Sequence, residues 1–382
     1  MTTTKDILSR LVGFDTVSSR PNLDLIAFAE DFLTSRGFSA HRITKDTGEK
    51  CGLYAQLGPS GDGILLSGHT DVVPVDGQVW TRSPFRLSEE DGKLFGRGTT
   101  DMKGFVAAML SLADRAARAD LQEPLRLVLS YDEEVGCVGL QDMLARLAPL
   151  LGQPRVCIVG EPTEMQVAIG HKGKASLRAT CHGQSGHSAL APNFVNALYL
   201  ATDLVAELRG LQAELCEGGG RDPAYDIPYS TLHVGKLSGG TALNIVPDRA
   251  EVTFEYRHLA ADRPADILAR IKRAGRKVQK MHAKLGSNAR IDIDQYNAYP
   301  GLDVAPSDLV VSDVQRLAQT NETVKVAFGT EAGFFSELGI PTVVCGPGSM
   351  AGQGHKADEF ISCEQLAACD AMMDRILGEL TD

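Results

Sequence analysis

The sequence has few of the features that anchor a chain in a membrane or that build a disulfide framework. Its eight cysteines are scattered and form no CxxC pair, which argues against a disulfide framework, a zinc ribbon and a thioredoxin-type centre. No apolar run approaches the roughly 18 residues that a membrane-spanning helix needs. The N-terminal segment lacks the basic-then-apolar layout of a signal peptide. We therefore expect a cytoplasmic protein with reduced thiols and no membrane partner.

Basic residues are outnumbered, because 38 Lys and Arg stand against 49 Asp and Glu, for a formal charge of −11. An acidic surface repels nucleic-acid phosphates, so we expect no nucleic-acid partner. The one basic stretch, residues 270–284, falls within an expected helix at 263–285. Apolar residues recur along that helix four and three residues apart, forming one stripe: Ile267, Ile271, Ala274, Val278, Met281 and Leu285. The basic residues are then the solvated face of a helix that packs on a sheet.

Several catalytic and nucleotide-binding motifs are also missing. There is no GxxxxGK[ST] phosphate loop, no GxSxG nucleophile elbow and no HExxH helix. The glycines of GRGTTD lack the GxGxxG spacing, which argues against a dinucleotide site. Ser185 and His187 stand too close in GQSGHS to be assumed to form a nucleophile–base pair. Phosphate-loop, serine-hydrolase and HExxH chemistry are therefore not expected.

The composition is that of a globular chain. The 382 residues are 43% hydrophobic and 23% charged, which suits two or three domains. Short apolar runs at 63–69, 125–131 and 155–161 alternate with helical patterns at 103–119 and 139–151, after helices expected at 4–17 and 22–37. This alternation predicts an α/β fold with a mostly parallel sheet covered by helices on both faces.

The pattern of expected helices and strands changes between residues 175 and 298. Expected elements there follow the order β-α-β-β-α-β, which is the ferredoxin-like arrangement and a complete small domain. After residue 298 the alternation of helices and apolar strands resumes, with a helix expected at 307–320, a strand at 341–345 and a helix at 363–379. The sequence therefore predicts a catalytic domain in two parts, 1–174 and 299–382, interrupted by an inserted α+β domain at 175–298.

Chemistry-bearing side chains follow the apolar strands of the first domain. His69 and Asp71 come at the end of the first strand, Glu133 and Glu134 follow the second, and Glu161 follows the third. The carboxyl ends of strands are where open α/β sheets bind ligands. Taken alone, the His-x-Asp pair could cap a loop, and the glutamate pair could simply face solvent.

Two further residues extend this pattern. Asp101 precedes the expected helix at 103–119, and His355 lies in a glycine-rich loop near the C-terminus. Several carboxylates at one sheet edge repel one another unless a cation compensates them. Two imidazoles with several carboxylates suit Zn²⁺ or a similar divalent ion. The set is large enough for two metals that share a carboxylate and activate water for attack on an acyl or phosphoryl group.

These residues stand in segments that resemble the M20 family of metallopeptidases and amidohydrolases. The resemblance covers nearly the whole chain and is greatest to the acetylornithine deacetylase branch, with desuccinylases, aminoacylases and carboxypeptidases as relatives. The segments, in chain order, are SGHTDVVPVDGQVWTRSPF, DGKLFGRGTTDMKGF, DEEVG, GEPTEMQVAIGHKG, GQSGHSA, LSGGTALNIVPDRAEVTFEYR, GTEAGFF and GHKADE. Eight segments in order make the match specific, and they imply an inserted lid domain through which two copies form a homodimer.

The resemblance implies a role for each residue of the expected metal centre. One zinc is held by His69, Asp101 and Glu161, and the second by Asp101, Glu134 and His355, so that Asp101 bridges the pair; Co²⁺ or Mn²⁺ are possible substitutes. Asp71 orients the ring of His69. Glu133 is the general base, which takes a proton from water and delivers it to the departing amine.

The resemblance also implies substrate contacts. His187 stabilises the oxyanion, Arg257 binds a substrate carboxylate, Asn244 accompanies it on the lid, and Glu331 holds a substrate ammonium. Each has a structural alternative: a locally paired loop histidine, a salt bridge at a strand end, a turn asparagine and a helix N-terminal cap.

The activity implied is hydrolysis of Nα-acetyl-L-ornithine to ornithine and acetate for arginine synthesis. Two alternatives stay open within and outside that class. One is another N-acyl amino-acid hydrolase, such as a desuccinylase, an acetylcitrulline deacetylase or an aminoacylase, because a small change of pocket switches the substrate. The other is an inactive relative that only binds metal or ligand.

Overall fold

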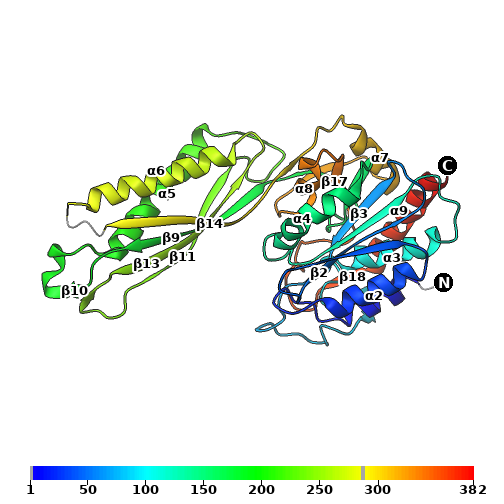
Figure 1. Cartoon of the computed structure of the whole chain (residues 1–382), viewed down its shortest axis with the longest axis horizontal. Coiled ribbons are helices and arrows are strands. Elements are labelled where there is room, and N and C mark those ends of the chain that lie inside the picture. The colour runs from blue at the N-terminus through cyan, green and yellow to red at the C-terminus, as the bar shows by residue number, and fades with distance from the viewer. Residues whose placement is uncertain (1–2, 285–288) are drawn as a thin grey trace. The chain divides into compact units, whose positions relative to one another are not determined.

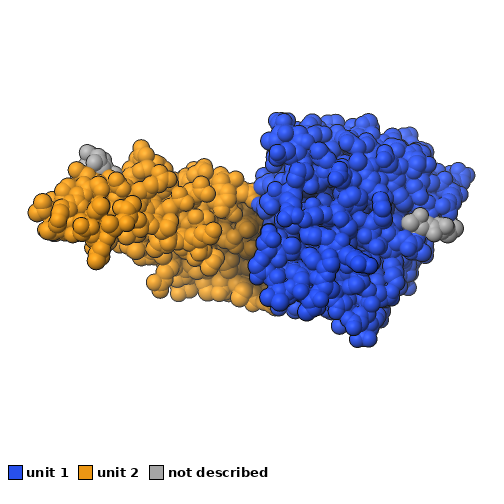
Figure 2. Space-filling model, turned by 90° about the horizontal axis from the view of Figure 1, so that it is seen from below, with its two compact units in different colours: residues 1–171, 302–382 blue, residues 172–301 orange. Residues whose placement is uncertain are grey.

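The computed structural model describes residues 3–284 and 289–382. The chain divides into two compact units, one made of residues 1–171 with 302–382 and the other of residues 172–301 (Figure 2). The junctions predicted from sequence were 174/175 and 298/299. Leu285, the expected last residue of the helical stripe, lies outside the described residues.

The first unit is an α/β domain. Its helices are α1 (Thr4–Val12), α2 (Leu23–Thr34), α3 (Lys103–Ala116), α4 (Val138–Leu151), α7 (Leu309–Ala318), α8 (Ala332–Glu337) and α9 (Cys363–Thr381). Its large sheet contains β1 (Ser39–Thr44), β2 (Cys51–Leu57), β3 (Ile64–His69), β6 (Leu125–Ser130), β7 (Val156–Val159), β8 (Val167–His171), β15 (Leu302–Asp303), β16 (Thr323–Val326) and β17 (Thr342–Val344). A small sheet contains β4 (Ser88–Glu90), β5 (Lys93–Phe95) and β18 (Phe360–Ser362).

The large sheet has the strand order β1-β2-β6-β3-β7-β17-β8-β15, with β16 also paired to β8. Its centre, β6-β3-β7-β17, is parallel, as the buried apolar runs predicted. At the flanks, β2 pairs antiparallel with β1 and β6, and β8 pairs antiparallel with β17 and β15 but parallel with β16. The α/β fold is therefore confirmed, and the sheet is mixed.

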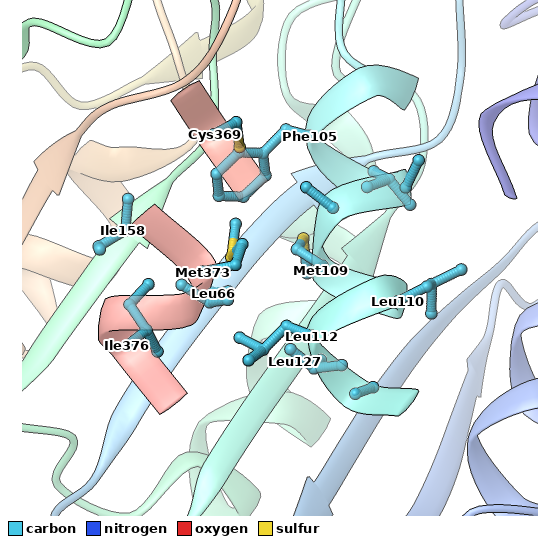
Figure 3. Packing of buried hydrophobic residues seen from close by; sticks show 14 of the residues in the cluster. Leu66, Phe105, Met109, Leu110, Leu112, Leu127, Ile158, Cys369, Met373 and Ile376 are labelled. Atoms are coloured by element: carbon cyan, nitrogen blue, oxygen red, sulfur yellow. The ribbon is translucent and has the colours of Figure 1, made fainter. Parts of the chain in front are cut away.

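The main hydrophobic core lies between the large sheet and the layer of α1, α2, α3, α7 and α9. In Figure 3, Phe105 and Met109 of α3 face Cys369 and Met373 of α9 above Leu66 of β3. The opposite face of the sheet is covered by α4, against β1, β2 and β6, and by α8, against β7 and β17. The strands therefore have helices on both faces.

Helix α1 ends at Val12, five residues before the predicted end at residue 17. Gly13 follows as the C-cap residue, and the buried ammonium of Lys103 donates to the carbonyls of Leu11 at 3.0 Å and Phe14 at 2.8 Å. These contacts satisfy carbonyls that a longer helix would have used. The residues after Phe14 form a loop instead, which brings Ser18 to the end of β3.

The second unit is a four-stranded antiparallel sheet with two helices on one face (Figure 1). Its elements are β9 (Gly173–His182), β10 (Gly186–His187), η1 (Ser188–Asn193), α5 (Ala197–Gly218), β11 (Thr231–Gly239), β12 (Ile245–Val246), β13 (Arg249–His258), α6 (Pro264–His282) and β14 (Arg290–Tyr299). The main strands follow the order β11-β13-β9-β14, and β10 pairs with β12 in a separate ribbon. This is the ferredoxin-like order of elements.

The basic helix α6 packs as its periodicity predicts. Ile267, Ile271 and Val278 are buried in the core of this unit, whereas Met281 is half exposed. Arg270 and Lys277 form ion pairs with Glu214 and Glu207 of α5.

The state of the cysteines and the character of the helices bear on two of the expectations, those about disulfides and membrane spans. All eight cysteines are free thiols, so no disulfide is present. Within residues 3–284 and 289–382, no helix combines the length and apolar character that crossing a bilayer requires.

Candidate active site and metal centre

The candidate site lies at the carboxyl ends of the central parallel strands. His69 is the last residue of β3 and stands opposite Ser130, the last residue of β6. Glu133 and Glu134 follow β6, and Glu161 follows β7. Because β6, β3 and β7 run parallel and in register, their ends deliver these side chains to one edge of the sheet.

Asp101 lies between two histidines. Its Oδ1 is 3.1 Å from His69 Nε2, and its Oδ2 is 3.3 Å from His355 Nε2. The same His355 nitrogen is 3.1 Å from Glu134 Oε2, and His69 Nε2 is 3.6 Å from Glu161 Oε1. A carboxylate that presents one oxygen to each imidazole is suited to a position between two cations.

Candidate metal ligands can also be grouped by the distances among their donor atoms. Two sets of three offer atoms that all lie within 4.8 Å of one another: His69, Glu133 and Glu161, and His69, Asp101 and Glu134. His355 joins the second set through its contacts with Asp101 and Glu134. The structure thus gathers all five predicted ligands and Glu133, while the division into two sets of ligands remains a prediction.

The environment of His69 decides which ring nitrogen is available. Its Nδ1 lies 3.0 Å from the backbone carbonyl oxygen of Asp71, which can only accept a hydrogen bond, so Nδ1 carries the proton. In the neutral ring, Nε2 then presents a lone pair toward Asp101 and Glu161. The carboxylate of Asp71 is farther from Nδ1, at 3.5 Å. Residue 71 orients the ring mainly through its main chain.

The carboxylate of Asp71 instead organises the loop after β6. Its Oδ1 accepts the backbone N–H of Glu133 at 3.0 Å, and its Oδ2 accepts the backbone N–H of Glu134 at 3.3 Å. Ser18 donates to Oδ2 at 2.6 Å. Asp71 is completely buried. Asp71 therefore sets the backbone position of both glutamates.

The electrostatics of this cluster favour a bound cation. Burial raises the pKa of Glu133 and of Glu161 well above the ordinary value, and neighbouring carboxylates add to the rise. Burial also raises the pKa of Glu134 to about 7. Hydrogen bonds to Asp101 and Glu134 raise the pKa of His355 to about 10. A divalent cation among these groups would offset the cost of burying several carboxylates together.

The donor set therefore fits a divalent metal. Imidazole nitrogens and carboxylate oxygens are the ligands that zinc and similar ions take in hydrolytic sites. Four of the five predicted ligands have side chains no more than 8% exposed, and His355 is half exposed at 49%. The buried ligands provide a rigid base, and the exposed one leaves a side open to solvent.

Two buried groups border Glu133. The thiol of Cys137 donates to Glu133 Oε1 at 3.2 Å. Glu331 accepts from Ser130 Oγ at 2.7 Å through Oε2, while its Oε1 has no hydrogen-bond partner among the described residues. Burial raises the pKa of Glu331 to about 7. Glu331 is the N-cap residue of α8, where an anion is favoured, but its side chain makes no capping hydrogen bond to that helix.

The remaining predicted residues lie on the second unit. His187 and Asn244 are neighbours there, because His187 pairs with Ile245, and the N–H of Ser188 donates to the Asn244 carbonyl at 3.1 Å. Both residues are exposed. The N–H of Ala189 donates to His187 Nδ1 at 3.1 Å, so the neutral ring carries its proton on Nε2.

Arg257 lies at the other end of β13 from this pair. It follows Arg249 by eight residues along the strand, which corresponds to about 27 Å. Strand β12, which pairs with β10, comes just before Arg249 in the chain. Arg257 Nε donates to Glu255 Oε1 at 3.0 Å. Within one copy of this unit, Arg257 is therefore separated from His187 and Asn244.

Sequence reasoning missed four polar residues near the ligands: Ser18, Gln78, Arg97 and Glu359. Arg97 and Glu359 stand in the GRGTTD and GHKADE segments, beside predicted ligands, and form an ion pair with both side chains 1% exposed. A pattern of charges does not show which members are buried, so these two could not be distinguished from solvent-facing residues. Gln78 stands in the SGHTDVVPVDGQVWTRSPF segment, where nothing sets it apart from its neighbours, and Ser18 lies outside every segment of the resemblance.

A protein-family comparison identifies the chain. Residues 65–379 match the model of peptidase family M20/M25/M40. The chain belongs to this family. Acetylornithine deacetylase of Pasteurella multocida is 33% identical over 380 residues, covering 97% of this chain and 96% of the relative. Acetylornithine deacetylase of Myxococcus xanthus is 33% identical over 377 residues, with the same coverage of each chain.

Solved structures share the fold. An M20-family metallo-carboxypeptidase of Sulfolobus solfataricus matches with a TM-score of 0.79 and 19% identity, over 100% of this chain and 99% of the other. A Bacillus subtilis protein described as a dinuclear metal-binding peptidase of the M20 family matches with a TM-score of 0.64 and 15% identity, over 99% and 97%. Family membership makes this chain a metal-dependent hydrolase, whose substrates are small-molecule amides.

Proposed function

We propose that this M20-family hydrolase removes the acetyl group from Nα-acetyl-L-ornithine, giving L-ornithine and acetate for arginine biosynthesis in the cytoplasm. The observation that carries the proposal is the near-full-length similarity to acetylornithine deacetylases, at 33% identity. The cluster of His69, Asp101, Glu133, Glu134, Glu161 and His355 supports it, because it offers both metal ligands and a general base.

Two Zn²⁺ ions are the proposed cofactors, with Co²⁺ or Mn²⁺ as substitutes. His69, Asp101 and Glu161 would hold one ion, and Asp101, Glu134 and His355 the other. Bound there, the ions supply Lewis-acid activation of water and of the amide carbonyl. The two-sided contacts of Asp101 with His69 and His355 support its assignment as the shared ligand.

Glu133 is the proposed general base. It accepts a proton from the attacking water as the water oxygen adds to the acetyl carbon, and it returns that proton to the nitrogen as the C–N bond breaks. Burial raises the pKa of Glu133, which favours a carboxylate able to take up the proton during the reaction. Asp71 and Cys137 orient it, through its backbone N–H and its Oε1 respectively.

The substrate contacts belong to the proposal as well. His187 would donate from Nε2 to the oxyanion, a role supported by the Ala189 N–H at its Nδ1. Arg257 would bind the substrate carboxylate, with Asn244 as a companion on the inserted unit. Glu331 would hold the ammonium of the ornithine side chain, which is supported by its unpartnered buried oxygen.

A homodimer formed through the inserted unit completes the proposal. In one copy, Arg257 lies near the end of β13, whereas His187 lies on β10, whose partner strand β12 comes just before the start of β13. A second copy could supply His187 to the site that uses the first copy's Arg257. Sedimentation velocity tests the dimer, and a mixture of His187→Ala and Glu133→Gln chains tests the shared site: activity regained on mixing supports donation across the dimer.

The deciding experiment is an amine-release assay on zinc-loaded protein. Nα-acetyl-L-ornithine is compared with N-succinyl-diaminopimelate, Nα-acetylcitrulline and acetylmethionine, each with and without a chelator. Chelator-sensitive preference in kcat/KM for acetylornithine supports the proposal. A preference for another substrate keeps the metal chemistry and replaces the substrate. No turnover of any of them by metal-loaded protein favours an inactive binding relative.

A further inference from the structure

The geometry points to Glu359, acting with Arg97 and Gln78, as a positioning unit that holds the loops bearing Asp101 and His355 together and so sets the affinity of the metal pair. This inference rests on the metal centre proposed above. None of the three residues touches the reacting atoms. Their role is to fix the backbone from which two ligands extend.

The carboxylate of Glu359 accepts four hydrogen bonds, all from the loop that leads to Asp101. Its Oε2 accepts from Arg97 Nη1 at 2.8 Å and from the Gly98 N–H at 2.9 Å. Its Oε1 accepts from the Thr100 N–H at 2.9 Å and from the Asp101 N–H at 3.1 Å. The bridging candidate Asp101 is thus held through its own main chain.

The small sheet explains how Glu359 reaches this loop. Phe360 pairs with Phe95 where β18 meets β5, so Glu359 and Gly96 leave the two strands side by side. The N–H of Gly96 donates to the Glu359 carbonyl at 2.9 Å, and Thr100 Oγ1 donates to the Phe360 carbonyl at 2.6 Å. Main-chain and side-chain contacts therefore join the segment after β5 to the segment before β18.

Gln78 extends the same network to His355. Arg97 Nη2 donates to Gln78 Oε1 at 2.6 Å, and Gln78 Nε2 donates to the His355 carbonyl at 2.9 Å. His355 stands in the left-handed backbone region, with φ of 60°. A non-glycine residue is held there only by its surroundings. The network thus contacts the main chain of Asp101 and the main chain of His355. These are the two candidate ligands whose side chains meet at Asp101 Oδ2 and His355 Nε2.

The cost of breaking the buried Arg97–Glu359 pair decides which substitutions can test the network. Removing one member of a buried ion pair leaves the other charge uncompensated, which is strongly destabilising. Glu359→Gln keeps the shape but replaces one acceptor oxygen with an NH₂ group facing N–H donors. Gln78→Glu keeps an acceptor for Arg97, removes the donor to the His355 carbonyl and adds a negative charge, whereas Gln78→Ala removes both contacts without adding a charge. Arg97 contacts Gln78 through Nη2 and Glu359 through Nη1, so the Gln78 variants retain the buried Arg97–Glu359 pair.

The test is Co²⁺ binding to metal-free protein, followed by visible absorption and by metal content per chain. Glu359→Gln is expected to weaken binding about 10- to 100-fold, the usual effect of losing a group that supports a ligand. Gln78→Glu and Gln78→Ala are expected to weaken the second equivalent, which needs His355, and to leave the first near wild type. Excess Co²⁺ should restore full occupancy in all three.

Two controls change the same residue types outside this network. Glu90→Gln removes an exposed ion pair with Arg82 on the same small sheet, and Gln122→Ala removes an exposed glutamine. Both should bind two equivalents as wild type does. Melting temperatures of the metal-free proteins separate positioning from folding, and those of the Gln78 variants are expected to match wild type.

The proposal is overturned if Glu359→Gln and both Gln78 variants bind two equivalents with wild-type affinity and spectrum. It is also overturned if they lose metal binding only in parallel with metal-free stability, because the network would then be merely structural. Wild-type protein that binds no Co²⁺ would instead refute the metal centre itself, which distinguishes failure of the proposed function from failure of this inference.

Discussion

The carboxylate of Asp71 accepts the backbone N–H of Glu133 at 3.0 Å, so a residue two positions after β3 helps to fix a residue three positions after β6. The two strands are neighbours and parallel, and their ends are joined by this hydrogen bond as well as by the sheet. Precise placement of a general base requires support of this kind. The same carboxylate also accepts hydrogen bonds from the Ser18 hydroxyl and the Glu134 backbone N–H, both through Oδ2.

Asp71→Asn is expected to lower kcat about 10- to 100-fold, because an NH₂ group would replace an oxygen that now accepts N–H or O–H donors. KM should change far less, since Asp71 lies completely buried behind the ligands. Steady-state kinetics at saturating zinc measure both quantities. Ser18→Ala, which removes a single donor, is the milder companion and should cost less. Equal activity of Asp71→Asn and wild type would contradict the role of this carboxylate.

Cys137→Ala is expected to lower kcat several-fold, because losing one hydrogen bond to Glu133 costs about 1 kcal/mol. Cys137→Ser keeps a donor and should recover most of the rate. Metal content and KM should stay at wild-type values in both variants. Cys157→Ala, which deletes a buried thiol elsewhere in the sheet, is the control and should leave kcat unchanged. An identical kcat for the Ala and Ser variants would show that the thiol does not orient Glu133.

Chelation is expected to abolish activity and to lower the melting temperature. Glu133, Glu134 and Glu161 lie together at one sheet edge, the first two partly buried and the third buried, and a bound cation offsets their repulsion. A ligand at a hundred times its Kd adds about 2.7 kcal/mol to the free energy of unfolding. Fluorescence of Trp80, the only tryptophan, follows unfolding of the first unit. Loss of activity without any loss of stability would mean that the metal is not compensating this cluster.

The second unit is expected to lose stability as the pH falls below about 6.5, the ordinary value for histidine. Burial lowers the pKa of His258, although its bond to the Leu259 carbonyl and the nearby Asp262 oppose the effect. The unfolded chain therefore binds a proton that the folded chain does not, and the free energy of unfolding decreases between that pH and the lower folded pKa. Above that pH the contribution is complete.

Urea unfolding of wild type and His258→Gln at about pH 7.5 and 5.5 measures this contribution. The glutamine variant should show a smaller decrease in the free energy of unfolding. His233→Gln, which changes an exposed histidine on β11, should retain the wild-type decrease. If His258→Gln and wild type depend on pH alike, another group is responsible.

Glu133→Gln is expected to lower kcat by at least about 100-fold while the metal content stays at the wild-type value, because general acid–base catalysis contributes factors of this order. Metal analysis of the purified variant is the accompanying measurement. Substantial residual activity at full metal occupancy would assign the proton transfer to another group, of which the buried Glu331 would be the first to examine.

The local pattern was enough to place the site in the fold. Residues 64–69, 125–130 and 156–159 are apolar and buried as strands, and the polar residues after them could be assigned to one edge because parallel strands end together. The α/β class and the β-α-β-β-α-β order of the inserted unit likewise follow from periodicity, which reports how each segment faces its core.

Contacts between distant segments were decided only by the tertiary structure. The pairing of β18 with β5 buries Glu359 against Arg97, and no local signal marks either charge as buried. The end of α1 at Val12 depends on the ammonium of Lys103, which comes from another helix. The antiparallel pairs at the flanks, such as β2 with β6 and β8 with β17, join strands from distant parts of the chain. Hydrophobic periodicity is a local property of the chain, whereas the partner of a polar group is set by residues far along it, and for that reason the position of the site could be derived from sequence while its supporting contacts could not.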